Sequence, residues 1–356
     1  MAPLFPDLSK DAILSFQFSS WYPKFAHLSI KSTFIRPLSH DFEEYLNADG
    51  VFVPEGSDDV PVKSTLSDDD DGGSEDDEEA GSAHESDGEL PPRRYAFPEL
   101  DDQIRMCIKE YGAVFPKLNF SAPKDASWVL PASSPLKCTT PSDVYLLLKS
   151  SDFITHDLSE DSVFDGCREG DRDGYSLELV LRKWYPVDRS REVRCFVRDN
   201  ALIGISQRDT NYYEFYNDLQ TQQKILIAVR ELWEKSIRHA WDSIQHYTVD
   251  LLLTRDLSRG HIIDFNPFAP RTDPLLFTYE ELLDIHLSHP STPTFKVIDS
   301  RAHPAANSNS PAHQHNMIPF DTLSLSSGRD IDEFAAAWKD QLEKGMSGRP
   351  GDSDSE

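Results

Sequence analysis

Three oxygen-bearing side chains lie in two neighbouring apolar segments of the sequence. The stretch Tyr247–Pro267 is YTVDLLLTRDLSRGHIIDFNP, with Asp250 in the first apolar run and Asp264 and Asn266 at the end of the second. If both runs are β-strands, Asp264 and Asn266 project from one face, and a hairpin would bring Asp250 beside them. Three such ligands suit a hard cation such as Mg²⁺, with phosphate and water completing its shell. The alternative is that Asp264 and Asn266 merely begin the loop that leads to Pro267.

Four basic side chains lie at or near the ends of predicted strands, where they could face the phosphates of a nucleotide. They are Lys117, Lys124, Arg194 and Arg208. Ammonium groups and guanidinium forks that face one cleft offset the charge of a triphosphate. Taken separately, each of them is more simply explained as a surface cation. The sequence contains neither GxxxxGK[ST] nor GxGxxG, so a nucleotide site here would use strands and side chains rather than a glycine-rich loop.

The elements that must position these residues are a mixture of helices and strands. Apolar spacing and a stop signal at Gly112 predict a helix from Asp101, and Thr140 with Pro141 predicts the start of a second helix. A third, longer helix is expected over 217–244. Strands are predicted at Val114–Lys117, Trp128–Leu130, Leu177–Lys183, Val193–Val197, Leu202–Ser206, Tyr247–Leu253 and His261–Phe265, with a hairpin turn at Arg198-Asp199-Asn200. This mixture, without repeats, indicates an α+β or mixed α/β core.

Composition limits the class of protein. The 356 residues carry 62 acidic and 35 basic side chains, a net charge of −27, which disfavours a histone-like or general DNA-binding role. No apolar run is long enough for a membrane span and no signal peptide is evident, so a soluble intracellular protein is expected. Three histidines, His303, His313 and His315, lack the ligand pattern of a metal site. Four widely spaced cysteines are expected to be free thiols: Cys107, Cys138, Cys167 and Cys195.

About half of the excess negative charge lies in one short stretch. Residues 57–89 hold fourteen Asp or Glu against the single base Lys63. With almost no large apolar side chain after Leu66, this stretch is expected to be a disordered acidic insert that interrupts one domain, either as a solvated spacer or as an electrostatic or phosphorylated arm. The expected organisation is 1–56 as the N-terminal part of the domain, 57–92 as the insert, 93–300 as the core with the nucleotide and metal site, 301–318 as a flexible loop, 319–346 as a C-terminal helical segment and 347–356 as a disordered acidic tail.

Five segments together resemble the cell-division-cycle protein 123 family, also called the D123 family. They are SSWYPKF (Ser19–Phe25), VFPKLNFSAPKDASWV (Val114–Val129), LVLRKWYP (Leu179–Pro186), EVRCFVRDNALIGISQRD (Glu192–Asp209) and VDLLL…HIIDFNPF (Val249–Phe268). The resemblance implies an α+β protein with an ATP-grasp fold, whose two lobes clasp ATP and Mg²⁺. It also implies a cytoplasmic assembly chaperone for translation initiation factor 2, acting on the C-terminal domain of the gamma subunit and promoting its union with the alpha and beta subunits. No direct contact with nucleic acid or membrane is implied.

The resemblance further implies roles for individual residues. Lys117 resembles the lysine that reaches the α-phosphate, the loop Asn119–Ala126 would cover the nucleotide with Lys124 toward phosphate, and Leu179–Trp184 resembles the hinge whose backbone holds adenine. Many ATP-grasp ligases have Glu where this chain has Asp264, and no acceptor site is recognisable, so no catalytic residue is assigned. The implied ATP-binding residues are Lys117, Asn119, Ala122, Lys124, Arg182, Lys183, Trp184, Glu192, Arg194 and Arg208, and the implied metal ligands are Asp250, Asp264 and Asn266.

Three functions from different classes remain open from the sequence. The first is an ATP·Mg²⁺-dependent assembly chaperone, in which nucleotide orders the cleft and so presents a surface to the partner. The second is an ATP-grasp ligase or kinase with an unidentified substrate, and the third is a plain interaction protein with a decayed site. The aromatic residues Trp21, Tyr22 and Phe25 are common both in cores and at interface hot spots, and so do not decide between these functions.

Overall fold

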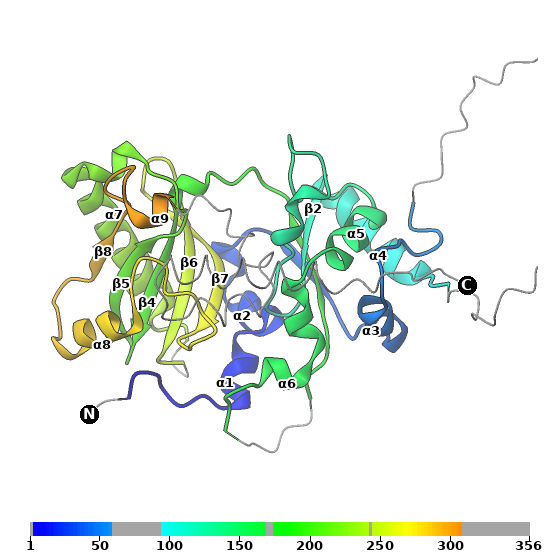
Figure 1. Ribbon diagram of the computed structural model, residues 1–356, viewed down its shortest axis with the longest axis horizontal. Coiled ribbons are helices and arrows are strands. Elements are labelled where there is room, and N and C mark those ends of the chain that lie inside the picture. The colour runs from blue at the N-terminus through cyan, green and yellow to red at the C-terminus, as the bar shows by residue number, and fades with distance from the viewer. Residues whose placement is uncertain (1–2, 59–93, 169–173, 242–243, 308–356) are drawn as a thin grey trace, which may run out of the picture. The chain divides into compact units, whose positions relative to one another are not determined.

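The computed structural model describes residues 3–58, 94–168, 174–241 and 244–307, all of which belong to one contact unit, Met1–Asn309. Two separate β-sheets, each with its own helices, make up this part of the chain (Figure 1). The acidic insert beyond residue 58, the 301–318 loop from residue 308 onward, the predicted helical segment 319–346 and the tail 347–356 lie outside the described residues. No helix within the described ranges is both long enough and apolar enough to cross a membrane.

The smaller sheet is antiparallel and lies against three helices. Its strand order is β1 (Ser32–Ile35), β3 (Leu179–Lys183) and β2 (Val114–Lys117). The helices that share its core are α3 (His40–Asn47), α4 (Pro98–Tyr111) and α5 (Pro141–Lys149). Thr140 and Asp143 form a capping box on α5, and Gly112, with φ of +82°, ends α4 in the left-handed region that glycine adopts freely.

The larger sheet has five strands and is antiparallel except at one edge, where β5 and β8 run parallel. Its order is β7 (Gly260–Pro267), β6 (Tyr247–Leu253), β4 (Glu192–Arg198), β5 (Ala201–Gln207) and β8 (Thr294–Lys296). The remaining helices are α1 (Lys10–Ser15), α2 (Phe18–Phe25), α6 (Glu160–Val163), α7 (Leu219–Leu232), α8 (Tyr279–Leu287) and α9 (Pro304–Asn307). Short 3-10 helices lie at Ala26–Leu28, Asp125–Trp128, Phe153–Leu158, Arg189–Arg191 and Glu214–Asn217.

The two faces of the larger sheet differ in polarity. Val249 and Leu251 of β6 pack into an apolar core that α2 and α7 also enter, whereas Thr248 and Asp250 alternate to the opposite face. Trp21 and Phe25 of α2 are fully buried in this core, with ring centroids 5.3 Å and 5.2 Å from Phe265. Two of the three N-terminal aromatic residues are therefore core residues, and the polar face of the sheet is left for the candidate site.

Most of the predicted elements are confirmed. The strands at Val114–Lys117 and Tyr247–Leu253 have the predicted bounds, and α4 ends before Gly112 as expected. The predicted hairpin turn joins β4 to β5, with positive φ at Asp199 and Asn200. The mixture of helices with largely antiparallel sheets is of the predicted α+β class.

Two predicted elements are wrong. The strand expected at Trp128–Leu130 is absent, because residues up to Trp128 form a 3-10 helix and the indole of Trp128 is 73% exposed. The long helix expected over 217–244 is α-helical only to Leu232 and then widens to a π-helix, Trp233–Ile237. Trp233, Ile237 and Trp241 all pack into the core of the larger sheet, and the wider turn keeps side chains four residues apart on one face.

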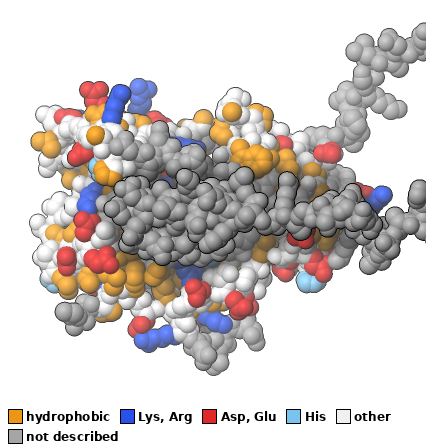
Figure 2. All heavy atoms as spheres, in the orientation of Figure 1, with side chains coloured by type: hydrophobic (Ala, Val, Ile, Leu, Met, Phe, Trp, Pro, Cys, Tyr) orange, Lys and Arg blue, Asp and Glu red, His pale blue; other side chains and the backbone are white. Residues whose placement is uncertain are grey.

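On the face shown in Figure 2, the described surface carries Lys and Arg side chains interspersed with Asp and Glu. Exposed charges of both signs lie within a few residues of one another, as in the pair of Arg230 with Glu234 and that of Lys235 with Glu231 on neighbouring turns. Such exposed pairs contribute little to stability. Charges in the interior, which water does not screen, interact more strongly.

Candidate functional site

Two buried cations of the smaller sheet reach the larger one. Lys117 at the end of β2 donates to Asp264 of β7 across 2.8 Å, and Arg182 of β3 donates to the carbonyl of Ile263 across 2.8 Å. Lys117 is 1% exposed and Arg182 is 6% exposed. The predicted phosphate-binding lysine and a predicted metal ligand therefore meet as a partly buried ion pair at the junction of the sheets.

A row of charged side chains crosses the larger sheet from this junction. Asp264 is paired with Asp250 on β6, and Asp250 is paired with Arg194 on β4, so all three lie side by side on one face. The predicted hairpin that brings Asp250 to Asp264 is thus confirmed. Arg194 holds Asp250 as a fork, with Nε 2.7 Å from Oδ1 and Nη2 2.9 Å from Oδ2.

Arg208, directly after β5, supplies a second guanidinium to Asp250. Its Nε lies 3.0 Å from Oδ2 of Asp250, and its Nη1 lies 3.1 Å from Oε2 of Glu192. Burial alone would raise the pKa of Asp250, but the positive charges of Arg194 and Arg208 hold that pKa well below its usual range. Asp250 is therefore ionised in the folded protein, and both of its oxygens are engaged by arginine.

Lys124 lies in the loop after β2, and its pKa is shifted by the charged side chains just described. Its pKa is lowered to about 8, first by the positive charge of Arg208 and then by burial, and Glu192, Asp250 and Asp264 counteract only part of this effect. A cation destabilised mainly by another cation marks a position where an anion would be stabilised. The loop therefore brings a fifth positively charged side chain of the predicted set to the site.

A buried carboxylate fixes the loop that carries Lys124. Asp157, which is fully buried, accepts hydrogen bonds from the backbone amides of Phe120 and Ser121 at 2.8 Å and 2.9 Å and from the Ser121 hydroxyl at 2.7 Å. At the other end of the loop, Asp125 accepts from the hydroxyl of Ser151 at 2.5 Å. The loop is thus held at both ends by side chains, which positions Lys124 without a glycine-rich backbone.

Sequence reasoning missed the anchoring role of Asp157 and a second buried carboxylate, Glu178. Glu178 accepts from Gln17 at 2.8 Å and from the amide of Ser19 at 3.0 Å, and so ties the start of α2 to the chain entering β3. Neither acid belongs to a recognisable motif. Only the three-dimensional contacts show that they support the site.

Four further predicted nucleotide-binding residues lie in the loop after β2 or at the end of β3. Asn119 is fully buried, and its side chain bonds to the backbone of Ser176 and Glu178 at 2.8 Å and 2.9 Å, so it braces the loop. Ala122 accepts from the amide of Lys124 at 2.7 Å within the same loop. Lys183 and Trp184 stand at the end of β3, where the side chain of Lys183 is exposed and the indole of Trp184 donates to Pro135 at 3.2 Å.

The backbone of the predicted adenine hinge is partly occupied. The amide of Lys183 donates to Lys31 at 2.8 Å and that of Trp184 donates to Ala113 at 2.9 Å. Within the described part of the chain, the amide of the next residue, Tyr185, has no partner. The amides of the last two residues of the predicted hinge, Lys183 and Trp184, are therefore already bonded to backbone.

The site contains more positive than negative charge. We define the charge cluster as eight side chains that face one another from both sheets and the loop. Its five cations exceed its three carboxylates by two charges, although the whole chain has a net charge of −27. The members are Lys117, Lys124, Arg182, Arg194 and Arg208 with Glu192, Asp250 and Asp264.

The surroundings of Arg182 are unfavourable for its positive charge. Its guanidinium lies 5.3 Å from the ring centroid of Phe18, its pKa is lowered by burial, and its Nε is buried without a hydrogen-bond partner in the described part of the protein. A buried charged group with an unmade hydrogen bond is unfavourable unless a ligand completes it. The charge cluster is therefore suited to an anion with several oxygens.

The predicted metal ligands differ in how well they suit Mg²⁺. Asp264 is 21% exposed, and Asn266 projects from the same face of β7, where both positions are partly accessible. Their oxygens are the hard donors that magnesium takes, whereas Asp250 is committed to two arginines. No cluster of three or more His, Cys, Asp or Glu side chains arranged for a metal occurs among the described residues. Asp264 and Asn266 therefore fit a magnesium ion whose other ligands come from phosphate and water.

Comparisons with known proteins agree with one another. A family model described as D123 matches residues 21–326. The translation initiation factor eIF2 assembly protein of Schizosaccharomyces pombe is 37% identical over 95% of this chain and 98% of its own length, and that of Xenopus tropicalis is 36% identical over 91% and 94%. The solved structure of Cdc123 from Schizosaccharomyces pombe matches with a TM-score of 0.62 and 34% identity, covering 83% of this chain and all of that one.

Proposed function

Because this chain belongs to the D123 family, we propose that it is an ATP- and magnesium-binding assembly chaperone for translation initiation factor 2. The partner is inferred from the relatives, which are named as assembly proteins for this factor. In the finer form of the proposal, the chain works in the cytoplasm and binds the C-terminal domain of the gamma subunit through an ATP-grasp fold. It then promotes the joining of the alpha and beta subunits.

The excess of buried positive charge is the observation that carries the nucleotide part of this proposal. A polyphosphate would supply negative charge beside Lys124 and a hydrogen-bond acceptor for Nε of Arg182, which has none among the described residues. The residues also follow one another along β3. The predicted hinge ends at Trp184, just past the strand, Arg182 lies within the strand, and Lys117 lies opposite Val180, two residues before Arg182. This order matches base, then phosphates, in an extended nucleotide.

Magnesium has a defined place in this arrangement. Asp264 and Asn266 would hold it, and the bound ion would neutralise part of the phosphate charge. Since Asp264 now pairs with Lys117 over 2.8 Å, a metal at Asp264 would release the lysine toward phosphate. The residues themselves therefore couple the binding of the ion to the binding of the nucleotide.

Isothermal titration of the purified chain with ATP, with and without MgCl₂, tests the nucleotide part. Lys117→Met is expected to weaken ATP binding by about ten- to a hundredfold, the value of one charge-assisted hydrogen bond. Asp264→Asn is expected to remove the dependence on magnesium. Lys24→Met, at an exposed position on α2, is the control and should bind as the wild type does. Unchanged affinity in Lys117→Met would contradict the placement of phosphate.

Assembly with purified subunits tests the partner part separately. We expect the chain to co-elute with the gamma subunit in size-exclusion chromatography and to accelerate the incorporation of alpha and beta. Lys117→Met, once shown not to bind ATP, should assemble the trimer more slowly than Lys24→Met. Full assembly by Lys117→Met would separate the chaperone role from nucleotide, and failure of the wild type to retain the gamma subunit would contradict the partner.

A further inference from the structure

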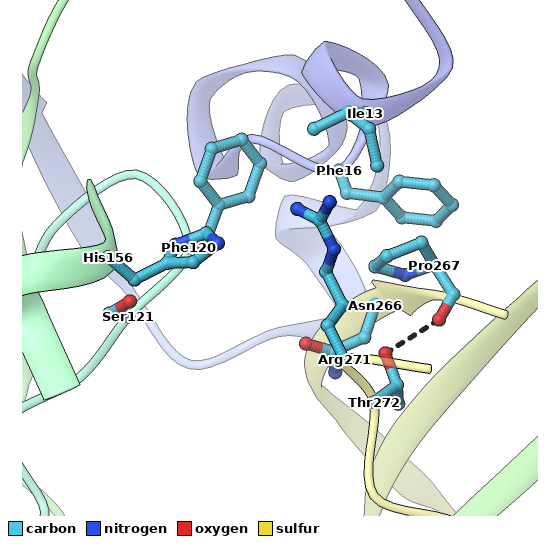
Figure 3. A pocket seen from close by; sticks show the side chains of 9 residues that line it. All are labelled: Ile13, Phe16, Phe120, Ser121, His156, Asn266, Pro267, Arg271 and Thr272. Carbon is cyan, nitrogen blue, oxygen red and sulfur yellow. Dashed lines mark hydrogen bonds between the residues drawn. The ribbon is translucent and has the colours of Figure 1, made fainter. Parts of the chain in front are cut away.

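A cavity of about 180 Å³ lies next to the charge cluster, beginning at Asn266 (Figure 3). Its walls come from segments far apart in the sequence: α1, the loop after β2, the 3-10 helix Phe153–Leu158, and the end of β7 with the turn that follows. The side chain of Asn266 projects from the same face of β7 as that of Asp264, two residues away. The cavity therefore borders the predicted metal site, because Asn266 belongs to both.

One wall of the cavity is apolar. Ile13 of α1 and Phe16, the residue after this helix, contribute to it, each 2% exposed, together with Phe120 and Pro267. Figure 3 shows the rings of Phe16 and Phe120 on either side of the guanidinium of Arg271. A ligand that fills this cavity must carry an apolar part, because these surfaces offer no hydrogen bonds.

The other wall, as far as the described residues form it, carries positive charge and no carboxylate. Arg271 lines it, and its guanidinium donates to the carbonyl of Val163 at 2.6 Å and to that of Asp165. Both acceptors are neutral backbone oxygens, and no carboxylate of the described residues lies within ion-pair distance of Arg271. Among the described residues, no carboxylate therefore pairs with Arg271 at the cavity.

His156 offers the second polar group on this wall. Its Nδ1 hydrogen-bonds to the buried carboxylate of Asp157 at 2.8 Å, which fixes the orientation of the ring. The nearby hydroxyls are already used, since Ser121 donates to Asp157 and Thr272 donates to Pro267 at 2.7 Å. With the amide oxygen of Asn266 assigned to magnesium, the groups left to meet a ligand are Nε2 of His156, Nδ2 of Asn266 and the charge of Arg271.

We propose that this cavity is a second ligand site, which binds a small organic monocarboxylate with a short apolar body. The carboxylate would be held by Arg271, with His156 and Asn266 beside it, and the apolar body would lie against Ile13, Phe16 and Phe120. A bare phosphate would leave the apolar wall unused, and a neutral apolar molecule would leave Arg271 uncompensated. The buried walls admit a small molecule rather than a peptide, while Arg271 itself is exposed and opens the cavity to solvent.

Titration with sodium butyrate, compared with the neutral isostere butyramide at the same sodium concentration, tests this proposal by ligand-observed NMR. Butyrate is expected to bind at millimolar concentration and butyramide about tenfold more weakly, because only the acid pairs with Arg271. Arg271→Gln, which keeps a donor for the carbonyls of Val163 and Asp165, should weaken butyrate at least fivefold. Arg259→Gln, at an exposed position in the β6–β7 turn, is the matched control and should change nothing.

Ile13→Phe provides a second variant that removes no polar group. It narrows the apolar end of the cavity and is expected to abolish butyrate binding while preserving the melting temperature within a few degrees. Equal binding of butyrate and butyramide, or binding of neither, overturns the proposal. A loss of affinity for ATP but not for ADP in Arg271→Gln also overturns it, because the cavity would then hold the terminal phosphate of the nucleotide.

Discussion

The lowered pKa of Lys124 predicts that the affinity for ATP falls steeply between pH 7 and pH 9. In the free protein this pKa is about 8, chiefly because Arg208 is close, against an ordinary value of 10.5. A polyphosphate beside Lys124 favours the ammonium form and returns its pKa toward the ordinary value. With these two values, protonation linkage gives an affinity about tenfold lower at pH 9 than at pH 7.

The sign of this effect follows from which form binds. Below pH 8 the ammonium is already present and binding proceeds without proton exchange, whereas above pH 8 each binding event must first protonate Lys124. At pH 8 about half a proton is therefore taken up per nucleotide. ATP is already ionised between pH 7 and pH 9, so its own titration does not produce the same pH dependence of the affinity.

Calorimetric titration in buffers with different ionisation enthalpies measures both the affinity and the proton uptake. Lys124→Arg is the matched variant, because its guanidinium stays charged to pH 9, and it should give a nearly flat profile with no proton uptake at pH 8. A wild-type affinity that does not change from pH 7 to pH 9 would refute this reasoning. So would a profile in Lys124→Arg as steep as that of the wild type.

Three further predictions concern stability and loop order. Asp250→Asn should lower the free energy of unfolding by about 3–5 kcal/mol at pH 7, since it leaves two arginines without their carboxylate. Because the folded-state pKa of Asp250 is depressed, the stabilisation by this carboxylate is full above about pH 4 and is lost as the pH falls below that. In urea denaturation, the difference in stability between wild type and variant should therefore shrink toward pH 3. Asp157→Asn should speed amide hydrogen exchange at Phe120 and Ser121 and weaken ATP binding severalfold. Asp152→Asn, at an exposed position, is the control, and unchanged exchange in Asp157→Asn would contradict the anchoring role of Asp157. Gly204→Ala should cost about 1–3 kcal/mol in thermal denaturation, because its Cβ would lie 3.1 Å from Leu282 and 3.2 Å from Phe277, whereas Gly174→Ala, with nothing within 4 Å, should be neutral.

The sequence predicted those elements that carry a local chemical signal. A glycine that must adopt positive φ ends α4, a capping box begins α5, and a two-residue turn with positive φ joins β4 to β5. The edge strands β1 and β8 were missed because four and three residues are too few to show an alternating pattern. Helix α8 was also missed, although Thr278 and Glu281 form a capping box that the sequence displays.

The candidate site was predictable as a set of residues but not as a set of pairs. Alternation along a strand was enough to put Asp264 and Asn266 on one face and Asp250 beside them. It could not show that Lys117, 147 residues earlier, reaches Asp264, because that contact depends on how the two sheets meet. The supporting acids Asp157 and Glu178 depend on the same long-range packing and have no sequence motif.

The pairing of acids with bases explains how one site can hold five cations before any ligand arrives. Asp250 is bound by two arginines and is shielded, so it acts as a fixed counter-charge for them. Asp264 has one ammonium partner and remains partly exposed, so the proposed magnesium ion would replace Lys117 there. A magnesium ion alone would leave Lys117 buried without a partner, and ATP alone would face Asp264 with no neutralising ion. Each ligand therefore removes the unfavourable charge that the other would leave, and the two should bind together more tightly than either binds alone.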